Sequence, residues 1–148
     1  MVVVRGRIRP SGPVVVGVDG SPSSESALEY GFAYADRHGL DLHALHAYPE
    51  LLLMPPYPLA PVNLDRARES AHETVRGALG RWARKFPDVH AESSVVPGPA
   101  ARMVVQASEG SGLVVVGCRG HGGFAGLLLG SVSHTLVRHA HCPVAVIR

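Results

Sequence analysis

Leu113-Val114-Val115-Val116-Gly117-Cys118-Arg119-Gly120-His121-Gly122-Gly123 is the stretch that decides the fold of this 148-residue chain. It begins as a continuous apolar, β-branched run, which is typical of a strand buried on both faces of a parallel sheet. Glycines follow, and after Gly130-Ser131 the segment 132–140 has the pattern of a helix. A strand, a glycine-rich loop and a helix N-terminus bring backbone N–H groups together, as phosphate sites do. The stretch therefore predicts an anion site.

The charges around this stretch agree with an anion site. No Asp or Glu occurs from Gly110 to Arg148, whereas three arginines and four histidines do. A second interpretation stays open, because buried strands have little room for acids and a glycine loop can simply turn the chain.

The other strong patterns alternate between strand and helix. Further strands are expected at 13–18, 41–48, 89–96 and 143–147, and helices at 22–38, 64–86, after Gly98-Pro99, and at 132–140. Ser21 is a good N-cap for the first helix and Gly39 a good C-cap. The residues of that helix that are expected to face the core are Ala27, Gly31, Tyr34, Ala35 and His38. The alternation predicts an α/β fold, with five parallel strands between four helices that cover both faces.

Composition bounds the class of protein. The chain is 46% hydrophobic and 18% charged with a formal net charge of +2, so a single globular domain is expected, without a strong pull toward nucleic acid or membranes. No apolar run approaches the roughly 20 residues of a membrane-spanning helix. Two cysteines give no disulfide framework, which favours a reduced, cytoplasmic setting. Residues 1–12 are expected to form a flexible arm, and the prolines of 49–63 an irregular loop.

Two familiar glycine motifs fail here. A Walker-type loop needs Gly-Lys-Ser/Thr, and Lys85 is the only lysine of the chain. The segment 120–125 matches the dinucleotide pattern GxGxxG/A. That fingerprint requires an acidic residue about 20 positions later on the next strand. The expected strand at 143–147 has no acid.

The turn after the first strand supplies a second wall for the site. If the first and fourth strands are neighbours, Asp19-Gly20-Ser21 and the glycine loop flank one crevice at the carboxyl ends of the strands. A nucleotide would then place its base and sugar toward Asp19 and its phosphates on the loop. Two alternatives stay open: Asp19 as a turn carboxylate and Arg119 as a solvated loop charge.

The spacing Gly117-x2-Gly120-x9-Gly130-Ser131 resembles the nucleotide-binding signature of the universal stress protein family. Further matches are the Asp19-Gly20-Ser21 turn, Leu45-His46-Ala47, Gly98-Pro99-Ala100 and 142–146. The resemblance covers residues 13–148 and implies one adenine-nucleotide alpha-hydrolase-like, Rossmann-like domain with strand order 3-2-1-4-5. It also implies the ATP-binding branch and a homodimer formed through the C-terminal strand.

The resemblance gives most of the expected ligand-binding residues, and charge alone adds Arg119 and His121, at positions where the family varies. Asp19 is expected near the adenosine and Ala47 at the adenine edge. Gly117 and Gly120 are expected to admit the phosphates closely and to adopt positive φ. The full expected set is Asp19, Gly20, Ser21, Ala47, Val116, Gly117, Arg119, Gly120, His121, Gly122, Gly130, Ser131, Val132 and Ser133.

The expected function is that of a nucleotide-responsive stress-tolerance module that binds ATP or ADP, with Mg²⁺ left open. One alternative is a slow ATPase or a nucleotidyl or phosphoryl transferase. Such an enzyme needs a carboxylate near the phosphates, and after Glu109 only Asp19 is an evident candidate. The other alternative is a scaffold dimer that holds a different adenosine compound. No catalytic or metal-binding residue is assigned.

Overall fold

The sheet at the centre of the molecule has the strand order β1-β6-β5-β2-β3-β4 in a computed structural model, which describes residues 2–3, 9–48, 64–120 and 129–148. The strands of this described part are β1 (Val2–Val3), β2 (Val14–Gly17), β3 (Leu42–Tyr48), β4 (Ala91–Pro97), β5 (Leu113–Gly117) and β6 (Val144–Ile147). The strands from β2 to β6 pair with one another in parallel. Numbered among themselves, they have the expected order 3-2-1-4-5, which confirms the predicted sheet.

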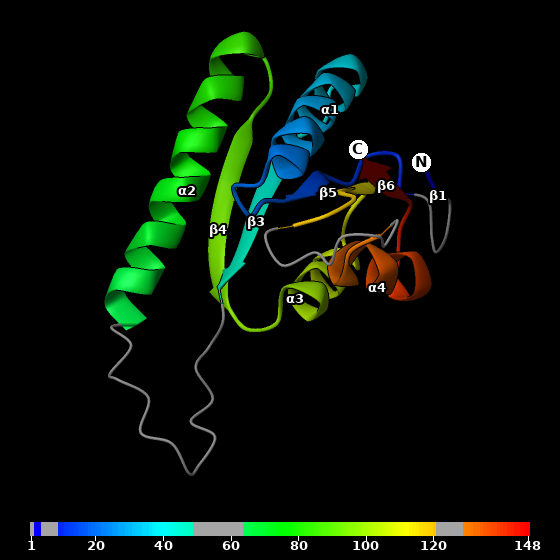
Figure 1. The fold of residues 1–148 in the computed structure, drawn as a ribbon. Coiled ribbons are helices and arrows are strands. Elements are labelled where there is room, and N and C mark those ends of the chain that lie inside the picture. The colour runs from blue at the N-terminus through cyan, green and yellow to red at the C-terminus, as the bar shows by residue number, and fades with distance from the viewer. Residues whose placement is uncertain (1, 4–8, 49–63, 121–128) are drawn as a thin grey trace.

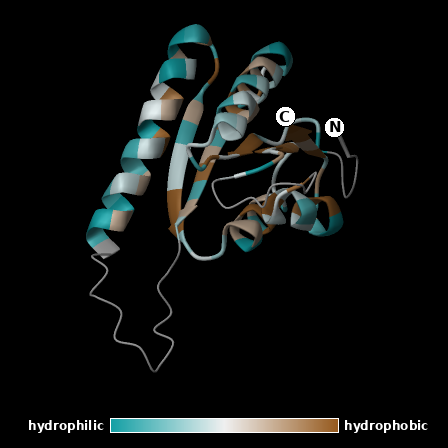
Figure 2. Ribbon diagram, viewed as in Figure 1, coloured by the Kyte–Doolittle hydropathy of each residue, from teal (hydrophilic) through white to brown (hydrophobic). Residues whose placement is uncertain are grey.

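Helices cover both faces of the sheet, as Figure 1 shows. The helices are α1 (Pro22–His38), α2 (Leu64–Lys85), α3 (Ala100–Ala107) and α4 (Ser131–His139). The first two pack on one face over Val14, Val16 and Val115, and the last two on the other face over Val15 and Val114. Each central strand thus buries alternate residues on both sides, which is why these strands are apolar throughout. Figure 2 shows the resulting concentration of hydrophobic residues in the sheet.

The first helix has the expected ends and a partly different buried face. The Ser21 side chain accepts a hydrogen bond from the Ser24 N–H, and Gly39 adopts the left-handed conformation at φ 62°. Leu28 and Phe32 are fully buried, whereas His38 is exposed. The expectation that His38 turns inward is therefore wrong. Ala27, Gly31 and Ala35 are buried as expected, and Leu28 and Phe32 widen this buried face.

A short strand at the sheet edge was not expected. Val2 pairs antiparallel with Ala145, and Val3 with Val144. The N–H of Gly12 donates to the carbonyl of Arg9, and Gly12 packs so tightly on Gly112 that a Cβ at Gly112 would lie 2.6 Å from the Gly12 oxygen. These described residues of the expected arm 1–12 are part of the fold. The expected loop at 49–63 lies outside the described residues.

Candidate functional site

A cavity of about 310 Å³ opens at the carboxyl ends of β2, β3 and β5. Strand β2 has β3 on one side and β5 on the other, so the winding of the sheet reverses here. Ligands of doubly wound sheets bind at such a position. The described residues that line the cavity are Gly17, Val18, Asp19, Ser24, Leu45, Ala47, Ala100, Val104, Val116, Gly117, Cys118, Arg119, Gly120, Gly130, Ser131, Val132 and Ser133.

One wall of the cavity is apolar. Val18, Leu45 and Val116 come from the strand ends, and Ala100 and Val104 from the first turns of α3. All but Ala100 are buried. Ligand pockets typically measure roughly 300–1,000 Å³ and pair an apolar lining with a few polar groups. The volume and this wall suit a small flat ring system.

Hydrogen bonds between its own residues hold the turn from β2 to α1. One oxygen of Asp19, Oδ1, accepts hydrogen bonds from the N–H of Ser21 at 3.0 Å and from its hydroxyl at 2.6 Å. The Ser21 hydroxyl oxygen in turn accepts the Ser24 N–H at 3.3 Å, which caps α1. Asp19 therefore has the structural role of a turn carboxylate. It also lines the cavity and is half-buried there.

Gly117, which ends β5, and Gly120, which follows it, pack closely against other parts of the protein. A Cβ on Gly117 would lie 2.6 Å from the Ser23 hydroxyl oxygen and 2.8 Å from the Ser23 carbonyl carbon, and one on Gly120 would lie 2.3 Å from Asp19 Oδ2. Among the described residues, positive φ occurs only at Gly20, Gly39 and Gly98. The expectation of positive φ at Gly117 and Gly120 is therefore wrong: close packing, and not a left-handed backbone, accounts for glycine there.

The start of α4 is open toward the cavity. Its N-cap, Gly130, has no side chain to accept a hydrogen bond, and the first turn has no acidic residue. The N–H of Gly130 donates to the Cys118 carbonyl at 2.7 Å, as does the buried Ser133 hydroxyl at 3.2 Å. Within the described part of the chain, the N–H groups of Ser131 and Val132 have no acceptor. Such N–H groups at a helix start attract an anion.

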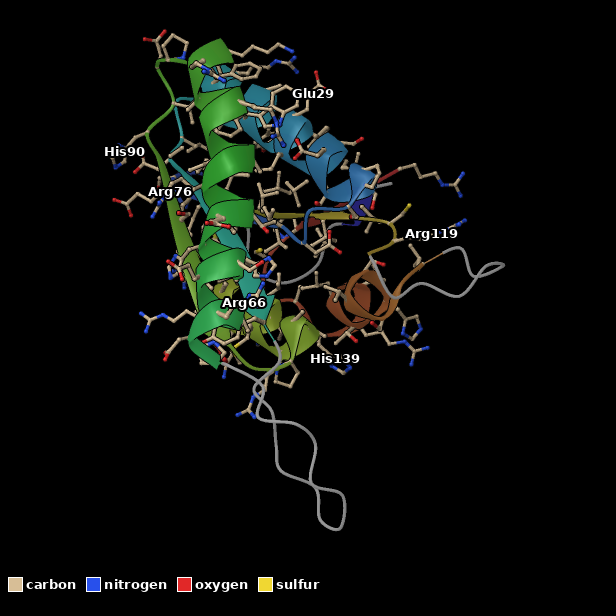
Figure 3. All side chains as sticks on the ribbon, turned by 60° about the vertical axis from the view of Figure 1, so that its left-hand side comes forward. Glu29, Arg66, Arg76, His90, Arg119 and His139 are labelled. Carbon is tan, nitrogen blue, oxygen red and sulfur yellow. The ribbon has the colours of Figure 1, made fainter. Side chains whose placement is uncertain are left out.

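Charge at the cavity is sparse. Asp19 and Arg119 are the only charged residues among the described residues that line it. Arg119 is exposed, and Figure 3 shows its side chain on the opposite side of the molecule from Arg66 and Arg76 of α2. Its backbone carbonyl accepts a hydrogen bond from the Ser23 hydroxyl. The structure therefore fixes the backbone of Arg119, while its side chain remains at the surface.

The cavity brings together most of the residues that the sequence predicted. Gly20 and Ser21 lie in the turn behind it and do not line it, and His121 and Gly122 lie outside the described residues. The predicted residues that line it are Asp19, Ala47, Val116, Gly117, Arg119, Gly120, Gly130, Ser131, Val132 and Ser133. The prediction missed the following lining residues: Gly17, Val18, Ser24, Leu45, Ala100, Val104 and Cys118. Gly17, Val18, Leu45 and Cys118 lie at the carboxyl ends of strands, which is the signal that could have found them, whereas Ser24, Ala100 and Val104 belong to the starts of helices.

The described histidines and cysteines belong to residue types that bind metal ions. In the described ranges, no group of three or more His, Cys, Asp or Glu residues could hold a metal ion. Burial raises the pKa of the Cys142 thiol to about 11, although a hydrogen bond with the Val114 backbone acts in the opposite direction. Cys142 is thus a core residue. None of the described helices is both long and apolar enough to cross a membrane.

Residues 11–148 match the sequence profile described as the Universal stress protein family. Among curated proteins, the chain is similar to Universal stress protein Rv1996 of Mycobacterium tuberculosis strain ATCC 25618 / H37Rv, with 39% identity over 141 residues. That match covers 94% of this chain and 44% of the relative. The chain thus spans a little under half the length of the curated relatives it matches.

Solved structures agree on the fold. Universal stress protein UspA from Lactobacillus plantarum superposes with a TM-score of 0.80 at 22% identity, and the match covers 96% of this chain and all of that one. A universal stress protein in complex with cAMP gives a TM-score of 0.72 at 26% identity, covering 95% of this chain and 99% of that one. The fold is the adenine-nucleotide alpha-hydrolase-like one that was expected.

Proposed function

Because the chain belongs to the universal stress protein family, we propose that its cavity binds an adenine nucleotide, ATP or ADP. Occupancy then regulates the contacts of the protein with its partners under stress. The observation that carries the proposal is the pairing of an apolar wall with an uncapped helix start across one cavity of about 310 Å³. The similarity to the protein that was solved with cAMP supports an adenine ligand.

The base and sugar belong at the apolar side. Adenine is flat and lies between Val104 of α3 and the strand ends, where Ala47 offers its backbone to the base edge. Asp19 lines the cavity at the carboxyl end of β2, where its carboxylate accepts a sugar hydroxyl. Its oxygen Oδ1 already accepts two hydrogen bonds from Ser21, which hold the carboxylate in a fixed orientation.

The phosphates belong at the start of α4. The N–H groups of Ser131 and Val132, the positive end of the helix dipole and the Ser131 hydroxyl all favour negative charge there. Gly130 leaves the approach open because it has no side chain. Mg²⁺, if it accompanies the nucleotide, would be held mainly by phosphate oxygens and water, because Mg²⁺ retains several waters and takes few protein ligands.

We propose a binding module in preference to a hydrolase. Phosphoryl transfer needs a group that positions the attacking water and usually a carboxylate that holds the metal. Asp19 is the one carboxylate among the described lining residues, and its Oδ1 already accepts two hydrogen bonds from Ser21. A slow ATPase remains the alternative, and a phosphate-release assay of wild type and Asp19→Ala separates the two.

The test is to identify the ligand. The protein is purified without added nucleotide, and any released small molecule is identified by mass spectrometry. Calorimetry then measures the affinity of the ligand-free protein for ATP, ADP, AMP, cAMP and adenosine. Tight binding that increases with the number of phosphates supports the proposal, whereas absence of binding by every adenine compound contradicts it.

We also propose that the protein acts in the cytoplasm as a homodimer through β6. An edge strand offers unpaired main-chain groups to a second copy. The short β1 lies on this edge opposite Val144 and Ala145, so dimerisation must displace or extend it. Light scattering of the wild type, of Val146→Pro and of a chain lacking residues 1–9 tests this. A monomeric truncated chain would contradict the β6 interface.

A further inference from the structure

The first turn of α1 contacts the loop after β5 at two points. The hydroxyl of Ser23 donates a hydrogen bond to the backbone carbonyl of Arg119, 96 positions along the chain. Next to it, Gly117 leaves no room for a side chain, because a Cβ would lie 2.6 Å from the Ser23 hydroxyl oxygen. The backbone of the loop is thus held against the start of α1 through Ser23.

This hydrogen bond fixes the direction of the next N–H group. In a planar trans peptide, the carbonyl and the following N–H point in opposite directions. The Arg119 carbonyl points to Ser23 in α1, so the Gly120 N–H points away from α1. The Gly120 nitrogen lies on the side of α4, where a Cβ on Gly130 would come within 3.9 Å of it. No described residue accepts a hydrogen bond from this N–H.

Three features of the cavity therefore converge. The Gly120 N–H, the open start of α4 and the absence of a side chain on Gly130 all lie at one end of the cavity. Asp19 also approaches Gly120, because its Oδ2 would lie 2.3 Å from a Cβ on that residue, and this carboxylate disfavours an anion next to it. An anion near Gly120 is favoured on the side of α4 only.

We propose that Ser23 is a positioning residue for the nucleotide phosphates. Its hydroxyl holds the Arg119–Gly120 peptide so that the Gly120 N–H joins those of Ser131 and Val132 on a single phosphate group. This inference rests on the proposed function and adds a residue outside the cavity lining to it. Without the hydroxyl, the glycine allows the peptide to rotate and to turn the Arg119 carbonyl oxygen toward the phosphate.

The variant Ser23→Ala tests the inference, with Ser26→Ala as the matched control. Ser26 lies one turn into the same helix, and its hydroxyl donates to the Pro22 carbonyl without reaching the loop. Calorimetry compares ADP with adenosine for each variant. Ser23→Ala is expected to lower the affinity for ADP about tenfold and the affinity for adenosine less than about twofold. The reason is that the charge-assisted hydrogen bond from the Gly120 N–H to the phosphate is lost. Ser26→Ala should change neither, and Ser23→Thr, which retains a hydroxyl, should bind ADP like the wild type.

A second measurement does not depend on nucleotide binding. In ¹⁵N-labelled protein without ligand, Ser23→Ala should shift the Gly120 amide resonance, because the Arg119–Gly120 peptide loses its fixed orientation, while Ser26→Ala leaves this resonance unchanged. Equal ADP affinity in wild type and Ser23→Ala would overturn the phosphate role, and an unchanged Gly120 amide would overturn the positioning. If the wild type binds no adenine compound, that result contradicts the proposed function itself, and the phosphate role of Ser23 with it.

Discussion

Helices α1 and α4, which both begin beside the cavity, differ in how they satisfy their first N–H groups. Helix α1 has Ser21 as a side-chain cap, Pro22 without an N–H, and Glu25 in its first turn. Helix α4 has Gly130 as its N-cap, no side-chain cap and no acid in its first turn. A capped start is complete without a ligand, while an uncapped one gains stability from an anion. This difference is the reason why we propose that α4 binds the phosphates and that α1 supports the site.

The largest expected effect comes from placing a side chain between the end of β5 and the first turn of α1. Gly117→Val would force a side chain into the backbone of Ser23, where a Cβ already lies 2.8 Å from the carbonyl oxygen. We expect a loss of stability of about 3 kcal/mol or more, with nucleotide binding lost in parallel. Chemical denaturation and calorimetry measure the two quantities.

The control for this variant is Gly77→Ala, at a helix position where a Cβ would meet no atom within 4 Å. This change should raise stability by up to about 1 kcal/mol, since alanine favours helix over glycine. A Gly117→Val protein with wild-type stability and no nucleotide binding would instead favour the original expectation that this glycine serves the phosphates alone.

The second effect comes from giving α4 the cap that α1 has. Gly130 has φ −72° and ψ 170°, which any residue adopts, and a Cβ there would make its nearest contact at 3.4 Å. Gly130→Asp should therefore leave stability unchanged or raise it by a few tenths of a kcal/mol. The carboxylate competes with the phosphates for the free N–H groups, so ADP should bind at least about thirtyfold more weakly, or roughly 2 kcal/mol.

Gly130→Ala separates the added charge from the added volume. It carries the same Cβ without an acceptor, and its loss of ADP affinity should be clearly smaller. If both variants bind ADP like the wild type, the start of α4 is not the phosphate site.

The third effect comes from removing the cap that α1 has. Ser21→Ala deletes the acceptor for the Ser24 N–H and the hydroxyl donor to Asp19. Stability should fall by about 1 kcal/mol, as for other N-cap serines, with little change in ADP affinity. A thermal melt measures the stability, and a calorimetric titration measures the affinity for ADP. A large loss of affinity at full stability would mean that α1 binds the ligand directly.

The smallest effect concerns the acid near the start of α1. Glu25 pairs with Arg81 of α2 and accepts a hydrogen bond from the Trp82 indole at 3.2 Å. Since this ion pair is largely exposed, Glu25→Gln should cost about 0.5 kcal/mol of stability. Glu29→Gln, which breaks the similar exposed pair with Lys85, is the control. A change in ADP affinity in either variant would contradict the purely structural role of this face.

Most of the sheet could be predicted because its signals are local. Each buried strand is a run of apolar residues such as Val14–Val16, and Ser21, Pro22 and Gly39 mark helix ends through their own backbone preferences. Strand β1 was missed although Val2-Val3-Val4 is a β-branched run. Its antiparallel pairing with Ala145 and Val144 of β6 is a contact between the two ends of the chain, which a local pattern does not report.

The site was predicted where glycine and charge mark it, and missed where it resembles the core. Leu45 and Val104 line the cavity and are buried, so in a sequence they look like any other core residue. The contact of Gly117 with Ser23 joins residues far apart in the chain. No local pattern reports such a contact, which is why glycine there suggested a phosphate role alone.

The most direct test of the central claim is an ADP titration of ¹⁵N-labelled protein, followed at the two helix starts. We expect the amide resonances of Gly120, Ser131 and Val132 to shift with ADP and far less with adenosine, while those of Ser24 and Glu25 in α1 stay in place. Shifts centred on the first turn of α1, with none at Ser131 and Val132, would contradict the assignment of the phosphates to α4.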